Sequence, residues 1–264
     1  MVAYTRHALL APWRSIFSLL VALCVVAPGA AWAKEEVLIA AASNLTAAFQ
    51  AMGPKFEAET GIHPVFNFGS TAQLARQIQN GAPMDVFAAA DEEHVRELEA
   101  AHLLVPGSVA EYAQGALALW VPPGTAAAPV LRRLEDLTQP QVRVIAVANP
   151  KLAPYGAAAI EALKQAKVWD QLKARVVYGE NINMVRQYGA SGNADAVFTA
   201  YPLVMQERGT VIRVDARLYT PIRQALGIIA GSKNASSARR FVEYLLRGGG
   251  RDVLKNFGYS TPAR

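Results

Sequence analysis

Short apolar runs alternate along most of the chain with longer segments in which apolar residues recur every three to four positions. The short runs are typical of buried β-strands, and the periodic segments are typical of amphipathic helices. We therefore predict an α/β protein. The first part of the chain alternates strictly, with expected strands at 37–41, 63–68 and 85–89 and expected helices at 45–59, 71–80 and 91–101.

A strong apolar strand at 115–121 ends in Pro122-Pro123-Gly124, where the chain must turn. A second α/β unit is expected after it, with helices at 129–137, 157–166, 182–190 and 203–208 and strands at 142–148, 175–178, 196–199 and 211–214. A last strand at 221–230 precedes two amphipathic helices at 235–247 and 251–257.

This order predicts two lobes, each a mixed sheet flanked by helices, joined by two crossing strands near 115–121 and 213–224. We expect one lobe to comprise residues 34–116 and 219–264, and the other to comprise 117–218. A chain that crosses twice between two lobes forms a hinge and a cleft between them.

Residues 1–33 have the three parts of a cleavable secretory signal: a basic start, the apolar run SIFSLLVALCVV, and Ala31-Trp32-Ala33 before the expected cut. We therefore expect the mature chain to be periplasmic. The single Cys24 lies in this segment, so the mature chain has no disulfide, thiol nucleophile or thiolate metal site.

The net charge of +5 contains two arginines of the predicted signal, and no basic cluster remains, so the composition does not favour nucleic-acid binding. Phosphate-binding, dinucleotide-binding and serine-hydrolase motifs are absent from the sequence. His63, His94 and His102 share no metal-ligand spacing. We expect neither an enzyme nor a resident cofactor.

Four segments place small residues and hydrogen-bond donors where a strand passes into a helix. A helix start leaves about four N–H groups without partners and carries roughly half a positive charge. Backbone N–H groups with Ser, Thr, Asn and Tyr side chains suit a fully deprotonated tetrahedral anion, which only accepts hydrogen bonds. The four segments are Ala42-Ser43-Asn44, Gly69-Ser70-Thr71, Pro154-Tyr155-Gly156 and Asn181-Ile182-Asn183.

The sequence around these segments resembles the periplasmic molybdate-binding proteins, the substrate-binding subunits of molybdate ABC transporters. The resemblance rests on AAASNLTAAF, GSTAQLARQIQNGAPMDVFAAAD, NPKLAPYGAAAIEAL, GENI and PIRQ, and it covers the predicted mature chain. It implies a type II periplasmic binding protein fold that closes on molybdate or tungstate and delivers it to a membrane permease. We expect the chain to be a monomer.

By matching motif, the resemblance implies that hydroxyls of Ser43 and of Ser70 or Thr71 contact the anion oxygens from one lobe. Backbone N–H groups of Tyr155 and Ile182 would contact them from the other. Molybdenum would then be held only as bound molybdate. Asn44 fits the branch of the family in which Asn follows the first hydroxyl residue.

Some residues depart from the family pattern or are not expected to contact the anion. Thr199 occupies a position where some family members have a Tyr donor, and Gln224-Ala225 stands where an Asp usually follows Arg223. Asp85 and Asp91 are expected to be scaffold residues, because a carboxylate would repel the anion.

Other functions remain open at this point. A binding protein for sulfate or another tetrahedral oxyanion would use the same donors. A secreted enzyme of the same fold would need a titratable group in the cleft, for which only Glu180, Lys151 and Tyr155 are candidates. A ferric-ion carrier would need several clustered Tyr or His ligands, and Tyr155 stands alone.

Overall fold

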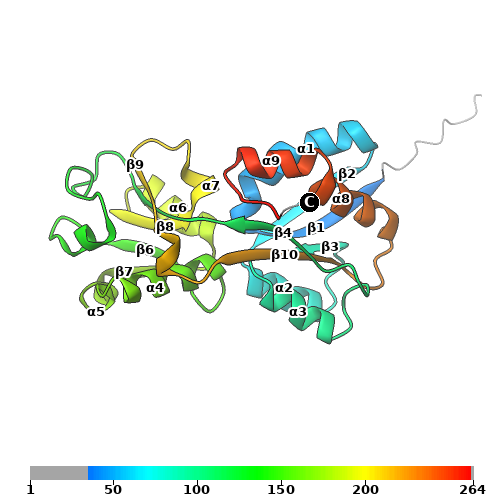
Figure 1. Ribbon diagram of the computed structural model, residues 1–264, viewed down its shortest axis with the longest axis horizontal. Helices are drawn as coiled ribbons and strands as arrows, with labels where there is room; N and C mark the ends of the chain where they lie inside the picture. Colours follow the sequence, from blue (N-terminus) through cyan, green and yellow to red (C-terminus); the bar gives the residue numbers. More distant parts are fainter. Residues whose placement is uncertain (1–34, 263–264) are drawn as a thin grey trace, which may run out of the picture. The chain divides into compact units, whose positions relative to one another are not determined.

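The computed structural model describes residues 35–262, so the predicted signal at 1–33, with Cys24, lies outside the described residues. The described chain forms two five-stranded mixed sheets, each flanked by helices, which we call the first and second lobes (Figure 1). The predicted α/β class is confirmed. Among the described residues, no helix combines the length and the apolar character needed to cross a bilayer.

The first sheet has the strand order β2-β1-β3-β10-β4. Its first three strands are parallel, whereas β10 runs antiparallel to both β3 and β4. The strands are β1 (Glu36–Ala42), β2 (His63–Gly69), β3 (Val86–Ala88), β4 (Ala110–Gly115) and β10 (Ile222–Ile228).

Helices cover both faces of the first sheet. Alternate side chains of a strand point to opposite faces, so a strand that is apolar throughout must be covered on both sides. Val37, Ile39 and Ala41 of β1 are buried with residues of α1, α8 and α9, whereas Ala40 is buried with residues of α2 and α3. Figure 1 shows these two groups of helices on either side of the sheet. The helices are α1 (Thr46–Thr60), α2 (Thr71–Gln79), α3 (Glu93–Ala100), α8 (Ala235–Arg247) and α9 (Gly249–Asn256), with the short 3₁₀ turn η1 (Ser43–Leu45) before α1.

The second sheet has the order β7-β6-β8-β5-β9, in which β6 is parallel to β7 and β8, and β5 is antiparallel to β8 and β9. Its strands are β5 (Leu117–Val121), β6 (Ile145–Ala148), β7 (Val176–Gly179), β8 (Ala196–Ala200) and β9 (Thr210–Arg213). Its helices are α4 (Pro154–Gln165), α5 (Trp169–Leu172), α6 (Ile182–Ala190) and α7 (Tyr201–Val204), with 3₁₀ turns η2 (Leu134–Thr138), η3 (Lys173–Arg175) and η4 (Ala216–Leu218).

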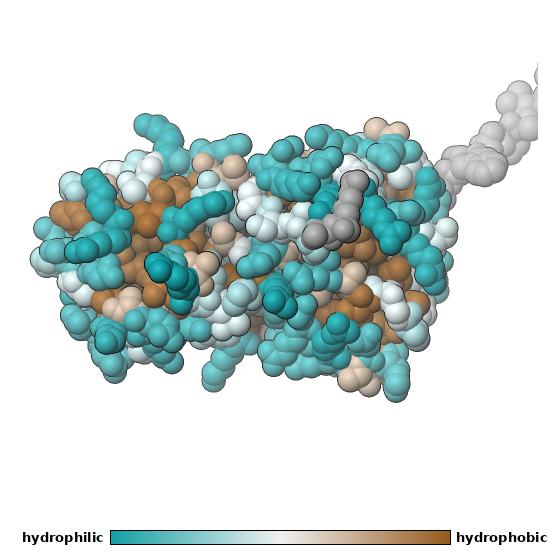
Figure 2. Space-filling view, in the orientation of Figure 1, coloured by the Kyte–Doolittle hydropathy of each residue, from teal (hydrophilic) through white to brown (hydrophobic). Residues whose placement is uncertain are grey.

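The chain passes between the two sheets twice. It leaves the first sheet from β4 to β5, with only Ala116 between these strands, and it returns from β9 to β10. We call β4 and β10 the hinge strands; they pair with each other at the edge of the first sheet. Figure 2 shows the surface over both lobes as mainly hydrophilic, with apolar residues visible between polar side chains.

Two predicted elements differ from the structure. The single strand expected at 115–121 is preceded by β4, whose polar-containing sequence AEYAQG gave a weak apolar pattern. The helix expected at 129–137 is reduced to the 3₁₀ turn η2. Asp136 accepts hydrogen bonds from the N–H groups of Arg132 and Arg133, at 2.8 and 3.0 Å, which holds a turn where the helix was expected.

Candidate functional site

The predicted strand-to-helix junctions lie at the carboxyl ends of parallel strands. β1 and β2 end side by side at Ala42 and Gly69, and β6 and β7 end side by side at Ala148 and Gly179. Helical turns begin within a few residues of each end. Each sheet therefore presents a pair of neighbouring helix starts, the arrangement that forms ligand sites in α/β folds.

The four junctions meet around one small cavity, which we call the junction cavity. Its volume is about 10 Å³, close to the space that one water needs. None of the described residues that line it is acidic or basic. All six residues expected at the site line it: Ser43, Asn44, Ser70, Thr71, Tyr155 and Ile182.

The first junction offers a hydroxyl and helix-start N–H groups. Ser43 is 4 % exposed, and no hydrogen bond within the described chain engages its hydroxyl. Its carbonyl oxygen accepts from the hydroxyl of Thr46 at 2.8 Å, which fixes the turn η1. The backbone N–H of Asn44 also has no acceptor in the described chain, as expected at a helix start.

The second junction offers two hydroxyls with different partners. Ser70 precedes α2 and donates its hydroxyl hydrogen to the side-chain oxygen of Gln73, at 2.7 Å. The hydroxyl oxygen of Thr71 accepts from the N–H of Ala90 at 3.1 Å. The hydrogen of Thr71 therefore remains available for donation, so Thr71 is the better placed hydroxyl donor of the two.

The second lobe contributes backbone N–H groups at two helix starts. Tyr155 follows Pro154 in the first turn of α4, and Ile182 is the first residue of α6. Neither N–H has an acceptor within the described chain. Asn181 caps α6, and its side-chain oxygen accepts from the N–H of Met184 at 3.0 Å.

Close packing brings the start of α4 to the end of β6. A Cβ added at Gly156 would lie 2.1 Å from the carbonyl oxygen of Ala148. Only glycine fits this contact. The contact places the N–H of Tyr155 against the edge of the second sheet.

The side-chain amide of Asn44 donates to residues behind the cavity and not into it. Its amide nitrogen donates to the side-chain oxygen of Gln224 at 2.9 Å and to the hydroxyl of Tyr259 at 3.0 Å. Both amide hydrogens are thus engaged. The N–H that Asn44 leaves without a partner is the backbone one.

The cavity can hold negative charge without a counter-ion. Its lining consists of hydroxyls, backbone N–H groups and apolar side chains, and each helix start adds about half a positive charge. Burial raises the pKa of the Tyr155 hydroxyl well above its ordinary value, so this residue stays neutral. The arrangement can bind a small anion that accepts hydrogen bonds from several directions.

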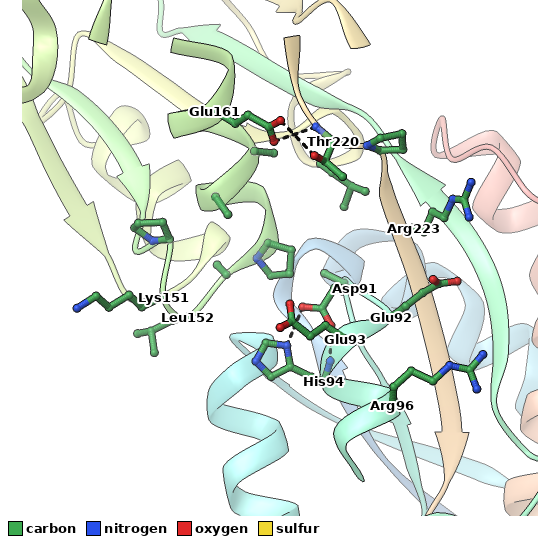
Figure 3. A pocket seen from close by; sticks show the side chains of 18 residues that line it. Asp91, Glu92, Glu93, His94, Arg96, Lys151, Leu152, Glu161, Thr220 and Arg223 are labelled. Atoms are coloured by element: carbon green, nitrogen blue, oxygen red, sulfur yellow. Dashed lines mark hydrogen bonds and ion pairs between the residues drawn. The ribbon is translucent and has the colours of Figure 1, made fainter. Parts of the chain in front are cut away.

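A larger cavity of about 750 Å³ adjoins the junction cavity and shares Ala90, Ala153 and Pro154 with it. Figure 3 shows charged side chains around this space, among them Lys151. Asp91 accepts from the N–H of His94 at 3.0 Å, a scaffold role as expected, and its other carboxylate oxygen lies 2.8 Å from the imidazole nitrogen of His94. That contact raises the pKa of His94.

The remaining candidates do not line the junction cavity. Glu180 is exposed, and Lys151 lies in the larger cavity. Asp85 is buried, and its carboxylate accepts hydrogen bonds from Leu38 N–H, Ser232 and Asn234, so it is a scaffold residue as predicted. Among the described residues, no group of His, Cys, Asp and Glu side chains could hold a metal ion.

Thr199 is fully buried on β8, and its hydroxyl has no hydrogen-bond partner in the described chain. It does not line the junction cavity.

Thr199→Val should raise the free energy of unfolding by about 1 kcal/mol, because a buried hydroxyl without a hydrogen-bond partner costs free energy. Urea unfolding measures the change. Thr60→Val is the control, and it should lower stability, because the Thr60 hydroxyl donates to Phe56 O at 2.7 Å. A Thr199→Val protein that is less stable than the wild type would show that the Thr199 hydroxyl does have a hydrogen-bond partner.

The buried side chains behind the cavity were not predicted from the sequence. Gln224 of β10 is fully buried and contacts Asn44, Tyr112 and Tyr155. An uncharged amide within the apolar strand IRQALGI was the available signal. Its partners are far away in the sequence, so no local pattern could identify them.

Comparisons with known proteins agree with this architecture. Residues 37–260 match the family described as bacterial extracellular solute-binding protein. The molybdate-binding protein ModA of Azotobacter vinelandii is 36 % identical over 229 residues, which cover 85 % of this chain and 89 % of that one. ModA of Rhodobacter capsulatus is 33 % identical, with coverage of 86 % and 88 %.

Solved structures give the same result. The periplasmic molybdate-binding protein of Azotobacter vinelandii superposes with a TM-score of 0.80 at 30 % identity, covering 86 % of this chain and all of that one. The sulfate-binding protein SubI of Mycobacterium tuberculosis, at 14 % identity and a TM-score of 0.72, shares the fold, with coverage of 86 % and 87 %. Membership of a solute-binding family confirms the prediction that this chain is not an enzyme. The chain belongs to the bacterial extracellular solute-binding proteins, in the group of ModA-type molybdate-binding proteins.

Proposed function

We propose that this chain is the substrate-binding component of an ABC importer and binds molybdate, and also tungstate, in the junction cavity. It would then deliver the anion to membrane permease subunits. Relatives named as molybdate-binding proteins, matched over most of both chains, support this function. The predicted cleavable signal supports a periplasmic location for the mature chain, which we take to be a monomer of two lobes, 34–116 with 219–264, and 117–218.

The observation that carries the proposal is the set of neutral donors from both lobes around one cavity. We assign the hydroxyls of Ser43 and Thr71 and the backbone N–H groups of Asn44, Tyr155 and Ile182 as donors to the anion. Ser70 lines the same wall, with its hydroxyl directed to the side chain of Gln73. A dianion accepts hydrogen bonds and donates none, so a lining rich in neutral donors and free of carboxylates matches it.

The same lining disfavours a protonated oxyanion. Such an ion carries an O–H group that needs an acceptor, and the described lining contains no carboxylate to receive it. A buried donor without an acceptor costs about 1–3 kcal/mol. Monoprotonated phosphate should therefore bind much more weakly than a fully deprotonated tetrahedral dianion.

Contacts between the lobes support binding by closure. The side-chain amide of Asn183 in the second lobe donates to the Thr46 hydroxyl in the first, at 2.7 Å. On another side, the N–H of Ala72 donates to the carbonyl of Leu152 at 3.2 Å. These bonds lie beside Ile182 and Thr71, so the donors of the two lobes face one anion only when the lobes are together.

Sulfate is the principal alternative ligand, since it has the same charge and symmetry as molybdate. Hydrogen-bond chemistry alone does not separate the two ions, whereas the size of a closed cage does. Selectivity then depends on how rigidly the lobes hold the donors apart, because a loosely held cage can shrink around the smaller ion.

Isothermal titration of the mature chain with molybdate, tungstate, sulfate and phosphate tests the proposal. We expect tight binding of the first two anions and weak or undetectable heat with sulfate and phosphate, because the proposed cage would space its donors for the larger dianions. Equal affinity for sulfate and molybdate would overturn the size argument. Absence of binding by any of the four anions would overturn the oxyanion site itself.

A further inference from the structure

A network of uncharged side chains lies behind the junction cavity. It consists of Asn44, Tyr112, Tyr155, Gln224 and Tyr259, which we call the Gln224 network; all five are buried. Gln224 itself is fully buried on the hinge strand β10. It does not line the junction cavity.

Gln224 is bonded to a site residue from each lobe. Its side-chain oxygen accepts from the Asn44 amide at 2.9 Å and from the Tyr112 hydroxyl at 3.0 Å. Its side-chain nitrogen donates to the Tyr155 hydroxyl at 3.2 Å. Asn44 belongs to the first lobe and Tyr155 to the second, so one amide spans the cleft directly behind the cavity.

The bonded groups are the side chains of Asn44 and Tyr155, whereas their backbone N–H groups remain without acceptors. Tyr259 strengthens the hold on Asn44, because its hydroxyl donates to the Asn44 carbonyl at 2.8 Å. Fixing both side chains from behind fixes the position of both N–H groups in front. The separation between these donors across the cleft is thus set through Gln224.

The chemistry of the position suits only an amide. The site requires two acceptor positions at one end, for Asn44 and Tyr112, and a donor at the other, for Tyr155. A glutamate would place a charge among buried groups, and an apolar side chain would leave these partners unpaired. Burial raises the pKa of Tyr112, Tyr155 and Tyr259, so the network stays neutral.

The other hinge strand, β4, packs tightly against the Gln224 network. A Cβ added at Gly115 of β4 would lie 1.9 Å from the Tyr155 hydroxyl oxygen and 2.7 Å from the Gln224 side-chain nitrogen. The backbone of β4 therefore lies against the bond between these two residues, and no water-sized gap separates them.

We propose that Gln224 is a positioning residue that sets the spacing of the donors of the two lobes and thereby the size selectivity of the cage. The inference rests on the proposed oxyanion-binding function. Without the Gln224 bonds, the two halves of the cage can shift and close around a smaller ion. Loss of Gln224 should then weaken molybdate binding more than sulfate binding.

The test compares Gln224→Met with the wild type by titration with molybdate, tungstate and sulfate. We expect molybdate affinity to fall about tenfold, the effect of losing a buried hydrogen-bonding group, and the ratio of sulfate to molybdate dissociation constants to fall by a similar factor. Gln114→Met is the matched control: Gln114 lies on the paired strand β4, is exposed, and should leave both values unchanged.

A second variant keeps the test decisive if Gln224→Met does not fold. Tyr155→Phe removes only the hydroxyl that Gln224 contacts and leaves the backbone N–H in place, so it should lower the same ratio. Circular dichroism and melting of the ligand-free proteins verify folding.

The outcomes separate the two proposals. Wild-type affinity and selectivity in a folded variant would overturn the positioning role. An equal loss for all three anions would also overturn it, because a merely structural residue would not change the ratio. If the wild-type chain binds none of the anions, the proposed function fails, and this inference fails with it.

Discussion

Ser43→Asp is expected to weaken molybdate binding by at least about 1,000-fold, because the new carboxylate would face a dianion inside a closed cavity. Ser43 is 4 % exposed and lines that cavity. Two like unit charges about 4 Å apart repel by ~4 kcal/mol at an effective dielectric constant of about 20, and a dianion doubles this repulsion. Isothermal titration measures the loss.

Ser43→Ala is the matched control for charge. It removes one hydroxyl donor and should cost about 1.5–3 kcal/mol of binding free energy, the range for a hydrogen bond to a charged group. Asp is favoured at helix starts, so the aspartate variant should fold. If the two variants bind molybdate equally well, charge does not govern the cavity, and the proposed site is wrong.

The aspartate variant also predicts a dependence on pH. Burial and the neighbouring dianion both raise the pKa of a carboxyl at this position, because each disfavours its ionised form. Below the raised pKa the group is neutral, so part of the affinity should return as the pH is lowered. The alanine variant has no such group and should show no comparable recovery.

Gly156→Ala is expected to lower both stability and anion affinity. The added Cβ would lie 2.1 Å from the oxygen and 2.8 Å from the carbon of the Ala148 carbonyl, and neither backbone atom can rotate away. Overpacking of this kind costs typically about 1–3 kcal/mol, and we expect the upper part of that range here. The start of α4 must also move, which displaces the N–H of Tyr155 from the cavity. Urea unfolding and titration with molybdate measure the two effects.

The neighbouring exposed residue provides the control for this substitution. Ala157→Ser adds one atom on the same turn of α4 with solvent beside it, so stability and affinity should stay near those of the wild type. An unchanged urea midpoint for Gly156→Ala would show that the junction can relax without cost, which contradicts the close-packing argument.

Local chemistry was sufficient to locate the cavity from the sequence. Apolar runs that end in Ser43 and Asn44, or in Ser70 and Thr71, specify a strand followed directly by a helix start, and both signals lie within a few residues. Parallel strands then place these starts at the same edge of the sheet, as β1 and β2 do at Ala42 and Gly69. The six expected residues consequently line one cavity.

Features that depend on distant contacts could not be predicted in this way. The Gln224 amide meets Asn44 across 180 positions of sequence and Tyr155 across 69. The direction of the Asn44 side chain follows from these contacts, so its sequence position suggested a donor side chain where the structure leaves only a backbone donor. The turn η2 has a different cause: the hydrogen bonds from Arg132 and Arg133 to Asp136 are local, and the spacing of apolar residues did not reveal them.

The uncharged lining of the junction cavity has a consequence for how cargo leaves. The described lining contains no lysine or arginine, so release of the anion breaks no ion pair with these residues. It also contains no carboxylate that would have to gain or lose a proton when the anion leaves. On the proposed function, unloading would need only the separation of the two lobes, because water can replace the hydrogen bonds of the cavity without any proton transfer.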